Sequence, residues 1–440
     1  MNTPICDFVQ NYISQNKLRL HMPGHKGCGL LGFEELDITE IPGADSLYDA
    51  DGIIKRSEEN ASSLFGCQTF YSTEGSSHCI RAMIYLALQK SKGNRLIAAG
   101  RNAHKTFLTA AALLDLEIDW LMGESDSYLS SNITPEYLEN YLKNKNNLPF
   151  AVYLTSPDYL GNILDIEKIS EICRKYGVLL LVDNAHGCYL KFLTPSLHPI
   201  DLGADICCDS AHKTLPALTG AAYLHISNKL DGYFKENVKS ALALFGSTSP
   251  SYLILLSLDA VNKYLYEFSH SIQSFAKKIE QLKIKIQDMG FSLVGNEPLK
   301  ITISPKPYGY EGQEFAKILN NFGIVAEFFD PDYITLMFTP KIDDKGLNKL
   351  LTALGKIPKK SPIITPPPTV YLPEKSLSVR QATLMECEWV DVKSARGRIS
   401  ASPTVGCPPA VPIIVYGEVV DENTVKCFEY YGISKCLVVK

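Results

Sequence analysis

The feature that most constrains this chain is an alternation of short apolar runs with amphipathic helical segments between residues 95 and 226. Apolar runs of four or five residues predict strands buried on both faces, and the segments between them have helical spacing. Strands that alternate with helices predict an α/β fold with a mainly parallel sheet and helices on both faces. The predicted strands are 96–99, 117–121, 151–155, 178–182, 206–208 and 221–225, and the helices between them include 103–114 and 165–176.

Two charged residues follow predicted strands, at the edge of the sheet where α/β proteins usually bind ligands. Asp183 ends the strand over 178–182, and Lys213 follows the strand over 206–208. A lysine that has lost much of its water can have the pKa of its amine lowered, as a Schiff-base lysine requires. Most loop lysines are solvated, so this position by itself does not establish catalysis.

A glycine-serine turn precedes a predicted helix over 78–89. Gly75, Ser76 and Ser77 follow an apolar run that begins near Thr69. A serine hydroxyl can cap a helix, and the free backbone N–H groups of a helix N-terminus attract anions. The segment fits a phosphate site and an ordinary capped helix equally well.

Composition excludes several classes of protein. The 440 residues are 45% hydrophobic and 21% charged, with a net charge of −5 and no basic block, which argues against a nucleic-acid partner. No apolar run reaches the length of a membrane span, and the N-terminus lacks a signal pattern, so we expect a cytoplasmic protein without a membrane partner. The 12 cysteines are scattered, and free thiols are the simplest interpretation.

Changes of pattern predict the domain organisation. We expect an N-terminal segment and large domain over 1–265, a small α+β domain over 266–358, a proline-rich linker over 359–375 and a C-terminal domain over 376–440. The predicted order in the small domain is β-α-β-β-α, with its first strand over 291–303. In the irregular loop around His21 and His25 no carboxylate or cysteine stands at ligand spacing, so we predict no metal site.

Six segments occur in the order that is typical of one family. They are His21 to Gly27, the turn at Gly75, Arg101-Asn102-Ala103-His104-Lys105, Val182-Asp183-Asn184-Ala185-His186-Gly187, Ser210-Ala211-His212-Lys213, and Cys407-Pro408-Pro409 followed by Gly417-Glu418. Together they resemble the compact form of the bacterial ornithine/lysine/arginine decarboxylases, which are pyridoxal-phosphate enzymes of the aspartate-aminotransferase fold. The resemblance covers nearly the whole chain, and it implies the PLP-dependent transferase fold and pyridoxal 5'-phosphate as the cofactor.

The resemblance implies four catalytic residues. Lys213 would hold the cofactor aldehyde as a Schiff base and later carry a proton, and Asp183 would pair with the pyridine nitrogen. His104 would stack on the face of the ring. His186 would lie near the Schiff base or the ring hydroxyl.

Further residues are implied to bind the cofactor or the substrate. Ala185 would lie against the second face of the ring, and the phosphate would be held by Gly75, Ser76, Ser77, Ser210 and His212. Ser249, in the run from Gly246 to Ser251, would reach the cofactor of a partner subunit; an ordinary helix-capping loop is the alternative. Glu418 would face the distal cation of the substrate, and His25 would also bind substrate.

We therefore expect a homodimer or higher homo-oligomer with shared active sites that decarboxylates arginine, lysine or ornithine to CO₂ and agmatine, cadaverine or putrescine. Two alternatives stay open: another reaction on the same fold, such as transamination or elimination, and a non-catalytic homologue. Glu74, inside the phosphate turn, and Asp158, where the family more often has a hydroxyl residue, leave the choice of substrate undecided.

Overall fold

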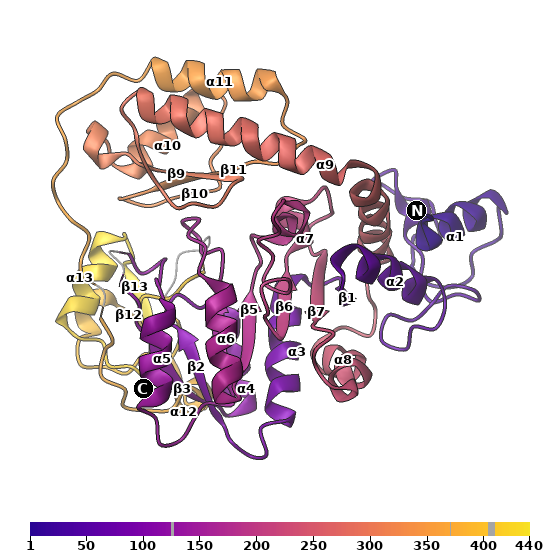
Figure 1. Cartoon of the computed structure of the whole chain (residues 1–440), viewed down its shortest axis with the longest axis horizontal. Helices are drawn as coiled ribbons and strands as arrows, with labels where there is room; N and C mark the ends of the chain where they lie inside the picture. The colour runs from indigo at the N-terminus through magenta and orange to yellow at the C-terminus, as the bar shows by residue number, and fades with distance from the viewer. Residues whose placement is uncertain (125–126, 370, 404–409) are drawn as a thin grey trace. The chain divides into compact units, whose positions relative to one another are not determined.

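The computed structural model describes residues 1–124, 127–369, 371–403 and 410–440 (Figure 1). The predicted family motif Cys407-Pro408-Pro409 lies outside the described residues. The chain forms two compact units: Met1–Gly93 with Leu179–Gln273, and Asn94–Val178 with Ser274–Lys440.

The first unit is built on four strands in the order β1-β7-β6-β5. These are β1 (Gln68–Ser72), β5 (Leu179–Asp183), β6 (Ile206–Asp209) and β7 (Ala222–Ile226). β5 and β6 are parallel, whereas β7 is antiparallel to both of its neighbours, β6 and β1. Every residue of β6 and β7 is buried, as their apolar sequences predict.

Helices pack against these strands. Helix α3 (Gly75–Gln89) contacts all four of them, and α8 (Gly232–Phe245) packs on α3. The predicted helix over 78–89 begins earlier, since the glycine-serine turn forms its first turn. The remaining elements are α1 (Pro4–Ser14), η1 (Glu34–Leu36), α2 (Ile53–Phe65), η2 (Cys188–Phe192), α7 (Ala211–Thr214) and the start of α9 (Tyr252–Asp288).

The second unit contains three parallel strands in the order β4-β2-β3, which are β2 (Leu96–Gly100), β3 (Glu117–Leu121) and β4 (Ala151–Thr155). Its helices are α4 (Lys105–Leu114), α5 (Pro135–Lys143) and α6 (Ile166–Tyr176). Each follows a capping residue whose side chain accepts a backbone N–H of the first turn, and these residues are His104, Thr134 and Asp165 respectively. Helix α4 therefore starts two residues later than the predicted 103–114, because His104 caps it.

The second unit also contains an antiparallel sheet in the order β10-β11-β9-β8. Its elements are β8 (Ser292–Val294), β9 (Lys300–Ser304), η3 (Lys306–Tyr308), α10 (Gly312–Asn321), β10 (Phe328–Phe329), β11 (Ile334–Met337) and α11 (Asp344–Gly355). The single strand predicted over 291–303 is wrong, because the segment forms a hairpin. Gly295 allows the turn: its φ is +78°, and a Cβ there would lie 2.5 Å from the carbonyl oxygen of Leu160.

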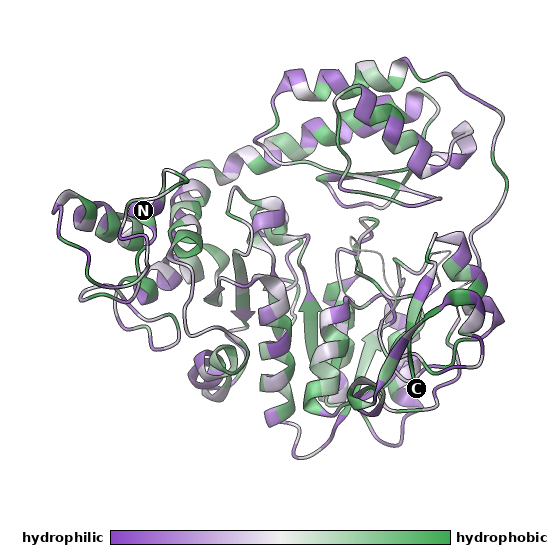
Figure 2. Cartoon of the chain, turned by 180° about the vertical axis from the view of Figure 1, so that it is seen from behind, coloured by the Kyte–Doolittle hydropathy of each residue, from purple (hydrophilic) through white to green (hydrophobic). Residues whose placement is uncertain are grey.

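The C-terminal part consists of α12 (Val379–Leu384), β12 (Cys387–Asp391), η4 (Val392–Ser394), α13 (Glu422–Tyr430) and β13 (Lys435–Val439). Strands β12 and β13 pair antiparallel, and the core beside them includes Ile414, Val420, Phe428 and Val438. In Figure 2 the strands at the centre of the molecule are mainly hydrophobic, whereas the helices around them carry both hydrophobic and hydrophilic residues. No helix of the described residues is both long enough and apolar enough to cross a membrane.

The predicted domain boundaries remain predictions. One of them, between 265 and 266, falls inside helix α9.

Candidate functional site

Lys213 lies in the short helix α7, directly after β6, and is half-buried. Its Nζ is 3.0 Å from Nε2 of His186, which is 5% exposed. His186 follows the end of β5, so the parallel pairing of β5 and β6 brings the two residues to the same edge of the sheet. An amine and an imidazole at hydrogen-bond distance must share a proton between them. Two of the predicted catalytic residues are therefore in contact.

Asp183 ends β5 and is 2% exposed. Its Oδ1 accepts the backbone N–H of Ala185 at 3.2 Å and the thiol of Cys208 at 3.7 Å. A buried carboxylate is costly unless it is hydrogen-bonded and faces a positive charge. Asp183 is thus suited to hold a protonated nitrogen at this edge of the sheet.

A group of N–H and O–H donors gathers at the N-terminus of α3. Gly75, with φ of +73°, opens the helix, and Ser76 and Ser77 follow in its first turn. The hydroxyl of Ser210, the residue before α7, donates to the hydroxyl of Ser76 at 2.8 Å. Strand β1 and strand β6 deliver these groups from distant parts of the sequence, and together they form a site suited to a phosphate.

Glu74 precedes this helix, and its carboxylate does not occupy the group of donors. Oε1 accepts the backbone N–H of Ser247 at 2.6 Å, so the carboxylate is directed to the segment 246–251. This contact places the acid beside the turn that leads to α9, and it accounts for a glutamate next to a predicted phosphate site. The hydroxyl of Ser72 accepts the backbone N–H of Glu74 at 3.1 Å.

Other predicted site residues of the first unit have contacts of their own. Nδ1 of His212 is 2.8 Å from the carbonyl oxygen of Ala221, and burial lowers the pKa of this imidazole. Nε2 of His25 is 3.3 Å from the carboxylate of Asp37. Ser249 is exposed, and its N–H donates to the hydroxyl of Ser247. The positive charge of the neighbouring Lys213 also lowers the pKa of His212.

His104 and Glu418 belong to the second unit. His104 caps α4, with Nδ1 accepting the backbone N–H of Thr106 at 3.2 Å. Glu418 is 3% exposed, and its Oε2 accepts both the N–H of Val415 at 2.8 Å and the guanidinium of Arg101 at 2.9 Å. Burial raises the pKa of Glu418, and the positive charge of Arg101 opposes that rise.

Arg101 belongs to one of the motifs of the family resemblance, but the sequence predicted no role for it. Its side chain is 6% exposed, it also donates to the carbonyl oxygen of Ile413, and its Cζ lies 5.0 Å from the centre of the Trp120 ring. The sequence did contain a signal for Arg101, because this residue directly follows strand β2, just as Asp183 ends strand β5. Its partner 317 residues later could not be read from the sequence.

Asp158, the second unusual acid, is tied to its own turn. Its two oxygens accept the backbone and side-chain N–H groups of Asn162, both at 2.8 Å, and the side chain is 3% exposed. Burial raises the pKa of Asp158, while hydrogen bonds from Ser130 and Asn162 oppose that rise. These contacts give the carboxylate a structural role.

The model of the Orn/Lys/Arg decarboxylase major domain matches residues 3–295, and that of the C-terminal domain of the same family matches residues 364–436. The arginine decarboxylase of Bacillus subtilis is 29% identical, over 96% of this chain and 92% of that protein. An arginine decarboxylase of Halalkalibacterium halodurans is 28% identical, over 96% of this chain and 91% of that protein.

Solved structures share the fold. The lysine decarboxylase LdcF of Francisella novicida superimposes with a TM-score of 0.81 at 18% identity, over all of this chain and 81% of that one. The constitutive lysine decarboxylase of E. coli gives a TM-score of 0.78 at 18% identity, over all of this chain and 82% of that one. The fold is thus the α/β fold of these enzymes, with a mainly parallel central sheet, and the chain belongs to the Orn/Lys/Arg decarboxylase family of amino-acid decarboxylases.

Proposed function

We propose that this chain decarboxylates a basic L-amino acid, with pyridoxal 5'-phosphate bound through Lys213. The observation that carries the proposal is the contact between Nζ of Lys213 and Nε2 of His186, at the edge of the sheet that also presents Asp183. The curated relatives named arginine decarboxylase make arginine the first substrate to test.

The residues of the first unit fit this cofactor. An aldehyde needs an amine, and Lys213 supplies one beside a proton acceptor. A phosphate needs N–H and O–H donors, which the first turn of α3 and the hydroxyls of Ser76 and Ser210 supply. A protonated pyridine nitrogen needs a negative charge nearby, which the carboxylate of Asp183 can supply. The donor chemistry at this one sheet edge therefore matches all three parts of the molecule.

When bound, the cofactor supplies an electron sink for the pair left on Cα when CO₂ departs. The side chains of the chain have separate tasks around it. Asp183 would keep a proton on the ring nitrogen, because its charge favours the cationic form. Lys213 would deliver a proton to Cα, and His186 would hold or return that proton at Nζ across the 3.0 Å contact. Ser76, Ser77 and Ser210 anchor the phosphate, and His104 and Ala185 are proposed to flank the ring.

We propose that Glu418 recognises the distal cation of the substrate. Its carboxylate accepts hydrogen bonds from Arg101 and Val415 at Oε2, and Oε1 is proposed to face the second cation. Arg101 would then act as a positioning residue that keeps the buried carboxylate ionised. A charge-assisted contact of this kind is worth about 1.5–3 kcal/mol.

We also propose that the enzyme is a homo-oligomer in which Ser249 of one subunit reaches the phosphate bound to another. Ser249 is exposed in this chain and belongs to the segment 246–251, which Glu74 holds through the backbone N–H of Ser247. Replacing Ser249 with alanine should therefore weaken cofactor retention in the oligomer.

The test is release of CO₂ from arginine, lysine and ornithine by the purified protein with added cofactor, without a keto acid. Release from one of them supports the proposal, whereas amino transfer or elimination without CO₂ would replace it with another reaction. Borohydride reduction followed by peptide mass spectrometry should place the cofactor on Lys213. Lys213→Ala should lose that label, and Lys191→Ala, which removes a lysine paired with Asp201, should keep it.

A further inference from the structure

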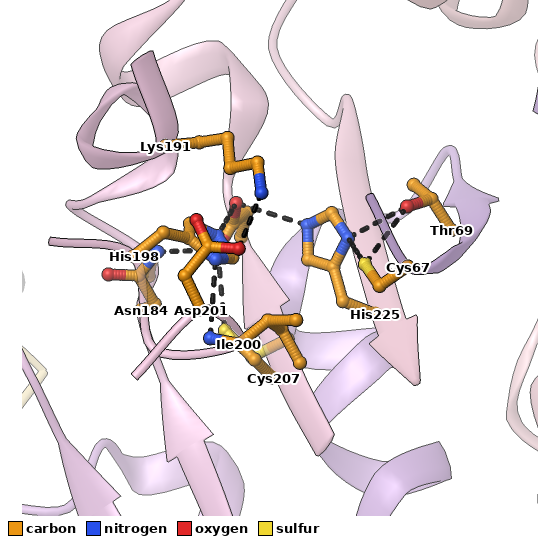
Figure 3. Close-up of polar contacts among 12 residues, drawn as sticks. Cys67, Thr69, Asn184, Lys191, His198, Ile200, Asp201, Cys207 and His225 are labelled. Atoms are coloured by element: carbon orange, nitrogen blue, oxygen red, sulfur yellow. Dashed lines mark hydrogen bonds and ion pairs between the residues drawn. The ribbon is translucent and has the colours of Figure 1, made fainter. Parts of the chain in front are cut away.

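A fully buried carboxylate ends β6, directly before Ser210 and four residues before Lys213. Asp209 is 0% exposed, and so are the four side chains that donate to it, which are Asn184, His198, Cys207 and His225. They come from the ends of β5 and β6, from β7 and from the loop after η2 (Figure 3). The proposed function uses none of these five side chains.

Both carboxylate oxygens of Asp209 accept hydrogen bonds, and the buried thiol of Cys188 also lies beside this carboxylate. Oδ2 accepts Nε2 of His198 at 3.0 Å and Nε2 of His225 at 3.1 Å. Oδ1 accepts the amide of Asn184 at 2.7 Å and the thiol of Cys207 at 3.6 Å. Four donors on one carboxylate offset the cost of burying its charge.

The second nitrogen of each imidazole fixes the direction of these bonds. The N–H of Ile200 points to Nδ1 of His198 at 3.4 Å, so the ring proton lies on Nε2, toward Asp209. Nδ1 of His225 is 3.0 Å from the hydroxyl of Thr69, which can donate to it (Figure 3). Phe65 packs against both imidazole rings and keeps the cluster dry.

The charge state follows from these contacts. Burial alone would raise the pKa of Asp209, but His198 and His225 lower it well below its ordinary value. Burial would lower the pKa of His225, and the charge of Asp209 raises it instead. Asp209 is therefore an anion throughout the working range of pH.

The donor atoms of His198, Cys207 and Asp209 lie within 4.8 Å of one another and are of the types that zinc binds. The hydrogen bonds already use these atoms, since each imidazole has a partner on both nitrogens and the carboxylate has four donors. These hydrogen bonds explain why the side chains gather here. The experiment below also measures whether the purified protein contains a metal.

The network reaches the proposed cofactor site through Asn184. This residue stands between Asp183 and Ala185, its N–H donates to the carbonyl oxygen of Cys208 at 3.0 Å, and its side chain donates to Asp209. A Cβ on Gly187 would lie 2.0 Å from Oδ1 of Asn184, so the chain closes tightly around this amide. One carboxylate thus ties the end of β5 to the end of β6.

We propose that Asp209 is a positioning residue of the cofactor site, whose carboxylate holds Asn184 and thereby sets where Asp183 stands relative to Ser210 and Lys213. The inference rests on the proposed function, because it takes Asp183 as the partner of the cofactor nitrogen. A displacement of about 1 Å at such a residue costs on the order of a hundredfold in rate.

The experiment compares the holoenzyme with Asp209→Asn, which keeps the shape and removes the charge. Its first readout is the pH titration of the absorbance of the bound cofactor, whose midpoint should shift by about one unit or more when Asp183 is displaced. Its second readout is kinetic: kcat should fall about 10- to 100-fold with KM little changed, since binding groups of the substrate are untouched. The absorbance readout does not require that a basic amino acid be decarboxylated, so it separates this inference from the proposed function.

Asp259→Asn is the matched control. Asp259 is also 0% exposed, and it accepts the N–H groups of Ile5 and Cys6 and the hydroxyl of Ser57, far in sequence from the site segments. This variant should lose thermal stability and keep the wild-type titration midpoint. Asn184→Ala serves as a second test, because it cuts the link and leaves Asp209 with its histidines, and it should shift the midpoint even if Asp209→Asn does not fold.

Two results would overturn the inference. One is a fall in melting temperature in Asp209→Asn or Asn184→Ala with the wild-type midpoint and kcat, which would make the network purely structural. The other is one equivalent of zinc in the purified protein that disappears in Asp209→Asn, which would make the carboxylate a ligand.

Discussion

Arg101 and Glu418 form a buried ion pair of 2.9 Å between two residues that are 317 positions apart. Arg101 follows strand β2, and Glu418 lies in the C-terminal segment. The carboxylate of Glu418 also accepts the backbone N–H of Val415. The pair attaches the C-terminal part of the second unit to its parallel strands. It also holds the carboxylate that the family resemblance assigns to the substrate.

Removing the arginine should destabilise the protein in a pH-dependent way. Arg101→Gln leaves Glu418 buried without its cation, at a cost of about 3–5 kcal/mol near pH 8. Burial raises the pKa of Glu418, and Arg101 is the largest of the influences that oppose this rise, so its removal raises the pKa further. Protonation then relieves the cost, so the stability of the variant should recover as the pH falls toward 5. Chemical denaturation at both pH values measures this, and an equal loss at both would refute it.

Replacing the acid should change substrate choice. Glu418→Gln should weaken binding of the best basic substrate about ten- to hundredfold, while the absorbance of the bound cofactor stays unchanged. The preference for that substrate over a neutral isostere such as norleucine or citrulline should narrow by the same factor. Competition kinetics measure the ratio. An unchanged preference would mean that the distal charge is read elsewhere, and the contacts of Glu74 and Asp158 make those two acids poor substitutes.

Asp183→Asn should separate cofactor binding from turnover. The amide keeps a similar shape at a buried position, so the cofactor should still bind. A neutral side chain cannot stabilise a protonated ring nitrogen, and turnover should fall by at least about a hundredfold. Near-normal CO₂ release by this variant would exclude the proposed role of Asp183.

The hydroxyl of Ser210 should contribute to cofactor affinity. Ser210→Ala removes one donor at the N-terminus of α3 and its bond to Ser76, so the dissociation constant of the cofactor should rise about tenfold. Ser271→Ala, which removes a hydroxyl bonded to the carbonyl oxygen of Phe268, is the control and should leave the constant unchanged. Equilibrium dialysis of the two variants distinguishes a phosphate contact from a general loss of stability.

Asp330 should make the stability of the small sheet depend on pH. Burial raises the pKa of Asp330 to about 7, with Asp332 adding to the rise and Lys306 opposing it. The pKa of Asp330 in the folded protein exceeds the ordinary value of 3.8. The folded state is therefore most favoured below pH 4, where Asp330 is neutral, and it loses this contribution as the pH rises through 7. Asp330→Asn should therefore flatten this part of the pH profile, by an amount on the order of 2–4 kcal/mol. Melting curves between pH 4 and 8 test the difference between the two proteins.

The local sequence determined the elements of the central sheet and the chemistry at their ends. Apolar runs predicted the strands that β4, β5 and β6 form, and α2 ends at Phe65 because Gly66 adopts the left-handed conformation after it. The order of Gly75, Asp183 and Lys213 along the chain sufficed to suggest the family. These are local signals, since periodicity, caps and turn residues act within a few positions.

Only the tertiary structure decided which side chains meet. The prediction of one strand where β8 and β9 form was wrong, because the turn at Gly295 depends on the close approach of Leu160. It assigned Asp209 no role and gave Arg101 no partner, because a buried charge is defined by the groups that surround it, and those groups come from distant segments. Burial and hydrogen bonding are properties of the packed molecule, and for that reason a sequence can name the reactive residues before it can say which of them hold the others in place.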